Sequence, residues 1–342
     1  MSRRASADPS PRPVSGLRPP PAGSSSAEHE GAIAGTGGSV PAIATSGLRK
    51  AFGPRVALHD LTLTVQPGEV FGFLGPNGAG KTTAMKILLG LVRPSGGEAR
   101  IFGRSPAEPA ARRRVGYLPE HFRFQEWATG AELLDFHGRL SGLGAGERAE
   151  RIPELLERVG LAGRGDERVR RYSKGMTQRL GIALALLHRP DLVLLDEPTS
   201  ALDPVGRREV RELVRELAAG GVTVFLNSHL LTEVEAVCHR VAIVNQGRVV
   251  ASGPLDDLAG AVAQLRVLLD RVDRELLALL GRHGQVVRAE GTAVTLAVDT
   301  LDVAPDLARQ LISAGYRLYG LVPVQQSLED IFVDLVGEVR EG

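Results

Sequence analysis

Nine consecutive residues in the first third of the chain combine types and spacing that suit phosphate binding. They fit the pattern G-x-x-x-x-G-K-[ST] and are Gly75, Pro76, Asn77, Gly78, Ala79, Gly80, Lys81, Thr82 and Thr83. Glycines allow successive backbone N–H groups to turn toward nucleotide phosphates, and the start of a following helix adds a favourable dipole. Lys81 would then reach the β- and γ-phosphates, and the Thr82 hydroxyl would ligate Mg²⁺. A glycine-rich turn with an accidental Lys-Thr pair is disfavoured, because a predicted strand precedes the loop and a predicted helix follows it.

Two acidic residues follow a short apolar run further along the chain. Residues 192–195 are all apolar, as expected of a strand buried on both faces, and the run ends at Asp196 and Glu197. The sheets of α/β proteins place ligands at the carboxyl ends of their strands. Asp196 would hold Mg²⁺ directly or through water, and Glu197 is placed to polarise an attacking water. Solvated acids at an ordinary strand end are the alternative, but the phosphate loop upstream favours a nucleoside triphosphatase.

A second helix start, just before the acidic strand, could bind another anion. Ser173 is a good N-cap for a helix predicted over 174–187, and the backbone N–H of Gly175 would lie in its first turn. This segment has no lysine-bearing phosphate loop beside it. A second anion site that points elsewhere is useful if it completes the nucleotide site of another copy. We therefore expect the working unit to be at least a dimer.

Strands and helices alternate through the middle of the chain, which indicates a mainly parallel α/β sheet. Helices are expected over 81–91, 131–140, 152–159, 174–187, 206–219 and 230–238, and strands over 61–65, 70–74, 191–195, 222–227 and 241–244. The stretch 122–171 lacks strand patterns and is interpreted as part of a helical insertion over about 121–188. The fold class predicted is a P-loop NTPase core with this insertion and an antiparallel β subdomain.

The two ends of the chain differ from this core in composition and pattern. Residues 1–43 are rich in Ser, Pro and Gly and are predicted to be a disordered tail, with a Pro-rich recognition segment as the alternative. The core is assigned to 44–253. Beyond it the patterns run strand 264–269, helix 274–281, strands 285–289 and 293–298, helix 303–314 and strand 316–322. This βαββαβ order predicts a C-terminal ferredoxin-like α+β accessory domain over 254–342.

A final helix is expected over 327–336. Its apolar residues recur at helical spacing, and such a stripe favours core packing over a membrane anchor. The stripe consists of Leu328, Ile331, Phe332 and Leu335.

With these motifs in this order, residues 43–253 resemble an ATP-binding cassette (ABC) ATPase. The resemblance implies that Phe52 stacks on adenine and that residues 75–83 form the Walker A loop around ATP. Asp196 and Glu197 match the Walker B acid and the catalytic glutamate of the family. His229 resembles the switch histidine that contacts the γ-phosphate.

Other positions carry the resemblance further and show where this chain departs from it. Ser173 and Gly175 occupy the places of the signature serine and second glycine, and Asp203 ends a segment similar to the D-loop. The usual glutamine before the helical insertion is replaced by Glu120, which can still ligate Mg²⁺ or orient water. The signature reads Ser-Lys-Gly-Met from Ser173. This form, together with Glu120, resembles cassette subunits that energise separate export permeases. The implied ligands are ATP and Mg²⁺, with Thr82, Glu120 and Asp196 at the metal.

The composition argues against a membrane-spanning or nucleic-acid-coating protein. The chain has 342 residues, a net charge of +1 and one cysteine, Cys238, which is expected to be buried. No stretch approaches the roughly 18 uncharged apolar residues of a membrane span. The arginine runs 112–114 and 168–171 are interpreted as solvated faces, so nucleic acid is not an expected partner. We expect a cytoplasmic protein that is peripheral on the cytoplasmic face of the cell membrane.

The resemblance implies an ATP-binding and ATP-hydrolysing subunit of an ABC transporter that energises export through a separate transmembrane permease. A homodimer, or a pair with a second cassette subunit, would enclose two MgATP, with Glu197 as general base and with Lys81 and His229 at the γ-phosphate. The alternative is a soluble ABC ATPase of DNA repair, translation or regulation. Chromosome-type members need a long coiled coil where only about fifty residues separate Glu120 from Ser173. Translation-type members carry two cassettes, and this chain has one Walker A pattern.

Overall fold

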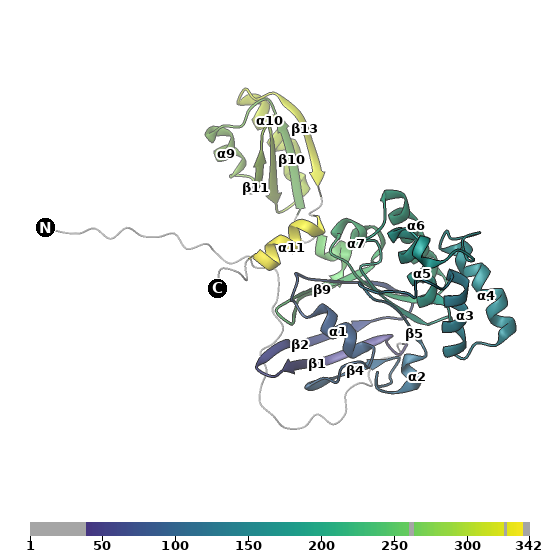
Figure 1. Ribbon diagram of the computed structural model, residues 1–342. Coiled ribbons are helices and arrows are strands. Elements are labelled where there is room, and N and C mark those ends of the chain that lie inside the picture. The colour runs from purple at the N-terminus through teal and green to yellow at the C-terminus, as the bar shows by residue number, and fades with distance from the viewer. Residues whose placement is uncertain (1–38, 260–262, 325–326, 338–342) are drawn as a thin grey trace, which may run out of the picture. The chain divides into compact units, whose positions relative to one another are not determined.

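A mixed β-sheet organises most of the chain in the computed structural model, which describes residues 39–259, 263–324 and 327–337 (Figure 1). The tail predicted over 1–43 lies outside these residues apart from 39–43, and Ile43 already belongs to the first strand. Within the described residues the strand order of this sheet is β4-β1-β2-β9-β8-β3-β7-β6-β5. The strands are β1 (Ile43–Phe52), β2 (Arg55–Val65), β3 (Val70–Leu74), β4 (Gly96–Ile101), β5 (Val115–Leu118), β6 (Leu192–Asp196), β7 (Thr223–Asn227), β8 (Arg240–Asn245) and β9 (Arg248–Pro254).

The half of the sheet formed by β8, β3, β7, β6 and β5 is parallel and is covered on both faces. Successive side chains point to opposite faces, so Leu192 and Leu194 pack on one side and Val193 and Leu195 on the other. Every residue of β3, β6 and β7 is buried. This confirms the predicted α/β core and explains the uninterrupted apolar run at 192–195.

The other half of the sheet is antiparallel, as predicted for the β subdomain. β1 pairs with β2 and with β4, and β8 pairs with β9. A single parallel pairing, Asp60 with Arg248, joins β2 to β9. The strand expected over 61–65 begins earlier, at Arg55, because strict alternation of buried and exposed residues is confined to Leu61–Val65 and its first half lacks this signal.

Helices cover the parallel strands on each side. On one face α1 contributes Met85 and Leu88 to a cluster with Phe71, Phe73 and Phe225. On the other face α5, α6 and α7 supply the apolar side chains. The helices of this region are α1 (Lys81–Leu88), α2 (Pro109–Arg112), α3 (Gly130–Leu140), α4 (Ala145–Arg158), α5 (Lys174–Leu186), α6 (Pro204–Ala219) and α7 (Leu231–Val237), with a 3₁₀ turn η1 at Val169–Arg171.

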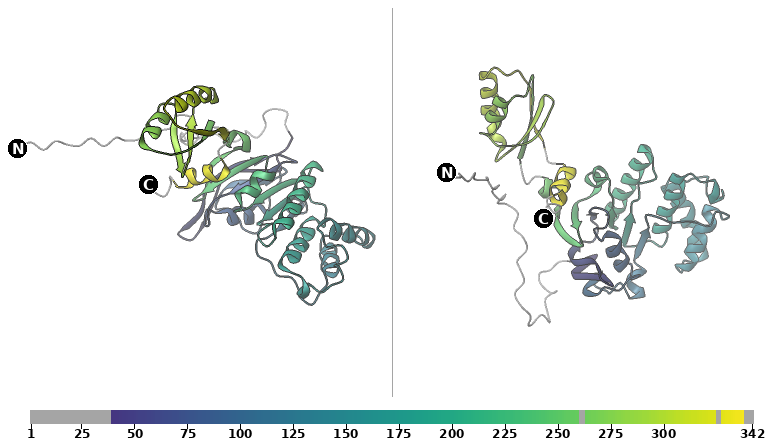
Figure 2. Two further views of the ribbon diagram at one scale, coloured as in Figure 1. Left: turned by 90° about the horizontal axis from the view of Figure 1, so that it is seen from above. Right: turned by 60° about the vertical axis from the view of Figure 1, so that its left-hand side comes forward.

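The helical insertion predicted over about 121–188 contains α3, α4 and α5, which pack against one another (Figure 2). Helix α3 starts with a capping box, in which Thr129 and Glu132 exchange side-chain and backbone hydrogen bonds. Helix α4 begins at Ala145, seven residues before the start expected from the sequence. The expectation placed Pro153 in the first turn, but the helix tolerates this proline in its interior. Among the described residues no helix is long and apolar enough to cross a membrane.

The C-terminal part folds as predicted into a four-stranded antiparallel sheet with the order β11-β12-β10-β13. Its elements are β10 (Ala263–Leu269), α9 (Arg274–Leu280), β11 (Gln285–Glu290), β12 (Ala293–Val298), a 3₁₀ turn η2 (Leu301–Val303), α10 (Ala304–Ser313) and β13 (Leu318–Val324). Alternate residues of β10 and β12 pack with α9 and α10 in a separate hydrophobic cluster. This is the βαββαβ arrangement expected of a ferredoxin-like domain.

Two helices at the ends of this domain pack with the core of the preceding domain. α8 (Leu255–Ala259) precedes β10, and α11 (Leu328–Gly337) follows β13. Leu328 and Ile331 of α11 are buried in the cluster that contains α5, α6 and α7. Core packing of the apolar stripe is thus confirmed, but the core involved is that of the preceding domain. The compact accessory fold spans 263–324, which is shorter than the expected 254–342.

Burial of His188 should make stability depend on pH. Its ring Nε2 lies 3.2 Å from the Val115 carbonyl oxygen, and desolvation lowers its pKa from 6.5. The unfolded chain then binds this proton more readily than the folded chain, so folding loses free energy as the pH falls through about 6.5. We expect His188→Gln to reduce the drop in Tm between pH 7.5 and pH 5.5 by about 1–2 °C in thermal melts. An equal drop in both proteins would contradict this role.

Candidate functional site

The phosphate loop predicted over 75–83 connects β3 to α1. Gly80, the N-cap of α1, has a φ of 102°, and a Cβ there would lie 2.5 Å from the Ala57 carbonyl oxygen. Only glycine accommodates both this conformation and this close approach. Lys81 turns its Nζ back into the loop and donates hydrogen bonds to the carbonyl oxygens of Gly75, at 2.6 Å, and Pro76, at 3.1 Å. The ammonium group is thus held over the loop.

The charge on Lys81 is balanced between burial and acids. Burial lowers the pKa of Lys81, and the carboxylates of Glu197, Asp196 and Glu120 oppose that shift. These acids belong to motifs far apart in the sequence. Their common influence on one ammonium group places the lysine and the acids in a single electrostatic environment.

The adjacent strands β6 and β7 bring Asp196 and Asn227 side by side. The two residues pair directly in the parallel register, and Asn227 Nδ2 donates to Asp196 Oδ1 at 2.5 Å. Burial raises the pKa of Asp196, while the hydrogen bond from Asn227 acts in the opposite direction. Asn227 is not among the site residues predicted from the sequence. Its position as the last residue of the strand predicted over 222–227 is the signal that could have found it.

Glu197 and His229 are in direct contact. Glu197 has a φ of 54°, a left-handed conformation that is uncommon for residues other than glycine and is often found at functional sites. The backbone N–H of His229 donates to Glu197 Oε1 at 2.9 Å, and the ring Nδ1 lies 2.7 Å from Oε2. The glutamate and the histidine predicted from separate motifs therefore meet at the carboxyl ends of β6 and β7.

A cleft of about 630 Å³ collects most of the predicted site residues. Three of the residues that line it, Arg55, Ala57 and Asn227, were not predicted. Phe52 is 50% exposed at this cleft, with Lys50 Nζ 4.8 Å from its ring centroid. The lining residues are Phe52, Arg55, Ala57, Asn77, Gly78, Gly80, Lys81, Thr82, Thr83, Glu120, Glu197, Asn227 and His229.

Seven predicted residues do not line this cleft. Gly75, Pro76, Ala79 and Asp196 belong to the phosphate loop and to the end of β6, whereas Ser173, Gly175 and Asp203 lie at the starts of α5 and α6. Ser173 is the N-cap of α5 and accepts a hydrogen bond from the Met176 backbone N–H at 3.2 Å. Asp203 is the N-cap of α6 and accepts one from the Gly206 N–H at 2.7 Å. A Cβ on Gly175 would lie 3.3 Å from the Leu202 side chain, so the signature segment and the D-loop-like segment are neighbours. Ser173, Gly175 and Asp203 thus form a second surface of the same chain.

The donor set around Lys81 fits Mg²⁺ that arrives with a nucleotide. The Thr82 hydroxyl and the carboxylates of Asp196 and Glu120 are hard oxygen donors, which Mg²⁺ prefers. The Oδ1 atom of Asn227 is buried without a hydrogen-bond partner among the described residues, so the cleft also holds an unused oxygen acceptor. No group of three His, Cys, Asp or Glu side chains in the described part could hold a metal. Phosphate oxygens and water would supply the remaining ligands of such a cation.

Comparisons with known proteins identify relatives over most of the chain. A family model described as ABC transporter matches residues 58–200. An uncharacterized ABC transporter ATP-binding protein of Nostoc sp. is 45% identical over 284 residues, which cover 82% of this chain and 83% of that protein. The Nod factor export ATP-binding protein I of Cupriavidus metallidurans is 37% identical over 302 residues, covering 86% and 97% respectively.

A solved structure also resembles the chain. It is a dimeric ATP-binding cassette in a post-hydrolysis state, bound to ADP and Pi. The TM-score is 0.58 at 25% sequence identity, and the match covers 62% of this chain and 98% of the other. The matched share is consistent with a cassette that is followed here by an additional domain.

The substitution Asp196→Asn should stabilise the nucleotide-free protein while it impairs hydrolysis. Burial raises the folded-state pKa of Asp196 above 3.8, so ionisation of this carboxyl opposes folding at neutral pH. Asparagine keeps an oxygen that can accept from Asn227. We expect the Tm at pH 7.5 to rise by about 2–4 °C in calorimetry without nucleotide or metal. The gain should shrink as the pH approaches 4. A lower Tm at pH 7.5 would show that attraction to Lys81 outweighs desolvation.

Proposed function

We propose a two-site ATPase dimer for this chain, which belongs to the ABC transporter family and is an ATP-binding, ATP-hydrolysing subunit. Each nucleotide would lie in the cleft of one copy and be covered by Ser173 and Gly175 of the other. The main support is the division of the predicted residues between the cleft and a separate surface at the starts of α5 and α6. One copy thus carries half of each of two sites, whether its partner is identical or a second cassette subunit.

The geometry supports a role for each group around the phosphates. The backbone N–H groups of 75–83 and the ammonium of Lys81 would bind the phosphates, while Thr82, Asp196 and Glu120 would hold Mg²⁺. Bound Mg²⁺ would neutralise developing charge on the phosphoryl oxygens. Phe52, half exposed at the cleft, offers its ring face to adenine.

Glu197 and His229 would handle the attacking water and the γ-phosphate. Glu197 is 7% exposed and lies at the cleft, where its carboxylate can orient a water and accept its proton. The contact with His229 fixes the carboxylate through both oxygens. The His229 ring would donate to the γ-phosphate. Asp203, which caps α6, would lie beside the partner copy.

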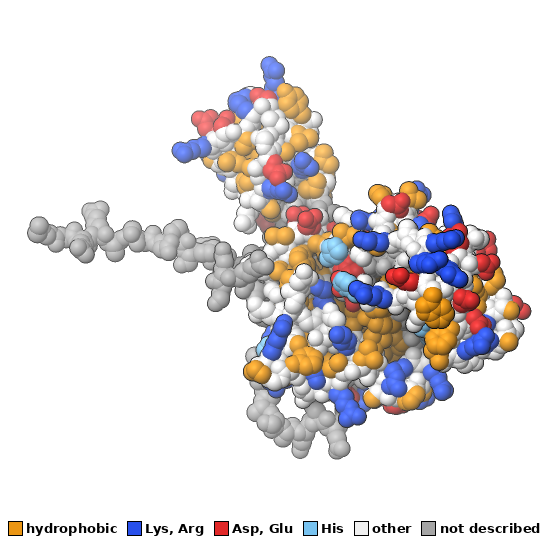
Figure 3. All heavy atoms as spheres, viewed as in Figure 1, with side chains coloured by type: hydrophobic (Ala, Val, Ile, Leu, Met, Phe, Trp, Pro, Cys, Tyr) orange, Lys and Arg blue, Asp and Glu red, His pale blue; other side chains and the backbone are white. Residues whose placement is uncertain are grey.

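We further propose that hydrolysis drives export through a separate membrane permease at the cytoplasmic face of the membrane. A relative of this chain is named as a Nod factor export ATP-binding protein. The segment that contains the helical insertion exposes three large apolar side chains: Trp127 at 74%, Phe136 at 53% and Leu140 at 70%. Figure 3 shows hydrophobic side chains among charged ones on the molecular surface. Exposed large apolar side chains such as those of the insertion segment are suited to anchor a protein partner. The soluble alternative finds no support among the relatives.

Replacement of the proposed base tests the ATPase site. Glu197→Gln removes the proton acceptor but keeps the shape of the side chain, so we expect kcat for ATP to fall by at least about 100-fold. ATP binding should persist, and ATP should accumulate in a dimer detectable by size-exclusion chromatography with light scattering. Glu212→Gln, an exposed change on α6, serves as the matched control. Hydrolysis by Glu197→Gln at the parent rate would refute the assignment.

Replacement of the exposed tryptophan tests the permease surface. Trp127→Ala should leave the ATPase rate of the isolated subunit within about twofold, because Trp127 does not line the cleft. It should weaken co-purification with the proposed membrane permease, co-expressed with this chain, by about tenfold or more. Ile312→Ala, which removes an exposed apolar side chain from α10, is the control. Equal recovery with both variants would place the permease contact elsewhere.

A further inference from the structure

The short helix α7 begins two residues after His229, so its position determines where the histidine lies. The Leu230 backbone N–H donates to Ser228 Oγ at 3.1 Å, and the Glu233 N–H donates to the Leu230 carbonyl at 3.0 Å. These hydrogen bonds restrict movement of the backbone between His229 and the first turn of α7. Whatever holds α7 therefore also holds His229.

The sheet fixes how closely α7 approaches β3. Val234 is fully buried and faces Gly72, where a Cβ would lie 2.8 Å from Val234 Cγ1 and 3.2 Å from the Cys238 sulfur. A side chain at position 72 would push the helix outward. The lack of one lets α7 sit directly on the strand that leads into the phosphate loop.

Residues on either side of Val234 hold the two flanks of α7. Successive residues of an α-helix are 100° apart, so Glu233 and Glu235 project to opposite sides of the face that contacts the sheet. On one flank, Glu235 accepts a hydrogen bond from the Leu328 backbone N–H at the start of α11. On the other flank, Glu233 faces α6. The contact with Gly72 determines the distance between α7 and the sheet. The contacts of Glu233 and Glu235 determine where α7 lies between α6 and α11.

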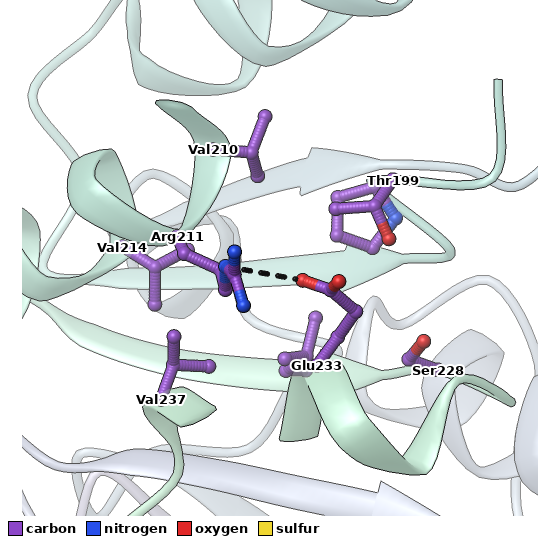
Figure 4. A pocket seen from close by; sticks show the side chains of 9 residues that line it. Thr199, Val210, Arg211, Val214, Ser228, Glu233 and Val237 are labelled. Carbon is purple, nitrogen blue, oxygen red and sulfur yellow. Dashed lines mark ion pairs between the residues drawn. The ribbon is translucent and has the colours of Figure 1, made fainter. Parts of the chain in front are cut away.

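The contact between Glu233 and α6 is an ion pair between a buried glutamate and a partly exposed arginine, whose side chain is 31% exposed. Arg211 Nε lies 3.5 Å from Glu233 Oε2, and Glu233 is only 9% exposed (Figure 4). The pair lines a cavity of about 10 Å³ together with Thr199 and Ser228, which lie close in sequence to Glu197 and His229. A second arginine of α6, Arg215, donates to the Ala236 carbonyl oxygen at 2.8 Å.

This ion pair joins α7, which starts at the nucleotide cleft, to α6, which starts at the second surface. Helix α6 begins after Asp203, and α7 begins after His229. Buried ion pairs rarely add net stability over apolar substitutes, but loss of one partner leaves a buried charge without compensation. An ion pair also favours one position of its two charged groups, whereas apolar contacts are non-directional. The pair is therefore better suited to fix the position of α7 than to stabilise the fold.

We propose that Arg211 and Glu233 are positioning residues for ATP hydrolysis, because they hold α7 against α6 and so keep His229 at Glu197. Neither side chain lines the nucleotide cleft. The inference rests on the proposed roles of His229 and Glu197. Arg211 and Glu233 would thus affect hydrolysis without contacting the nucleotide.

Three variants separate positioning from stability. Glu233→Gln and Arg211→Met should each lower both Tm and kcat, because each leaves one charge unpaired. The double variant carries neither charge and should recover the Tm. Its kcat should nevertheless stay about tenfold below that of the parent, with the KM for ATP unchanged within about twofold, since small displacements of catalytic groups slow the chemical step. Recovery of kcat along with Tm would overturn the proposal.

A spectroscopic measurement reports on the histidine itself. In the full chain labelled at histidine Cε1, the His229 resonance is identified by its loss in His229→Ala. It should shift in the double variant and not in Glu212→Gln, whose carboxylate is exposed on the same helix α6. An unmoved His229 resonance in the double variant would overturn the proposal.

The outcome also distinguishes this inference from the function on which it rests. If Glu197→Gln and His229→Ala hydrolyse ATP at the parent rate, the proposed catalytic roles fail whatever the pair does. If those two variants are inactive while the double variant keeps the parent kcat, only the positioning role fails.

Discussion

Parallel pairing of β3, β7 and β6 is the constraint on which the site depends. Strands that run in the same direction end at the same edge of the sheet, and here the ends carry the phosphate loop, Asn227 and Asp196. The register pairs Asp196 with Asn227, and the next residues along each strand lead to Glu197 and His229. Residues from motifs more than a hundred positions apart therefore meet without any long loop. The helices that cover the two faces make this register hard to shift, since a slip by one residue would exchange the buried faces.

Several residues at this edge of the sheet are in states that are energetically unfavourable for the folded chain. Asp196 is buried and Lys81 half-buried, with their pKa values displaced in opposite directions, and Glu197 adopts a left-handed backbone conformation. Each of these lowers the stability of the isolated chain, and the packed strands beneath them compensate. Their charges are complementary to a nucleotide with its cation, so binding relieves what folding alone leaves strained.

Most of the fold and much of the site could be predicted from the sequence, because the informative patterns are local. The loop at 75–83, the apolar run at 192–195 and the βαββαβ order each specify their own element. Asn227 was missed because an asparagine at a strand end is common, and only pairing with β6 shows its role. The start of α4 was misplaced because Pro153 is a local signal that tertiary packing overrides. The packing position of α11 could not be predicted, because an apolar stripe indicates that a helix is buried but not which core it packs against.

Because of the position of α11, the C-terminal fold is connected to the ATPase core as an inserted domain and not as a terminal extension. Its sheet is not simply appended to the ATPase, because α8 leads into it, α11 leads out of it, and these two helices contact each other on the ATPase core. The chain leaves and re-enters the core at neighbouring points, in the manner of an inserted domain. A truncation at the apparent boundary near Pro254 would strip a buried helix from beside α7, whereas exchange of 263–324 for a short linker would keep that helix. The domain is thus replaceable from within, while α11 belongs to the ATPase core.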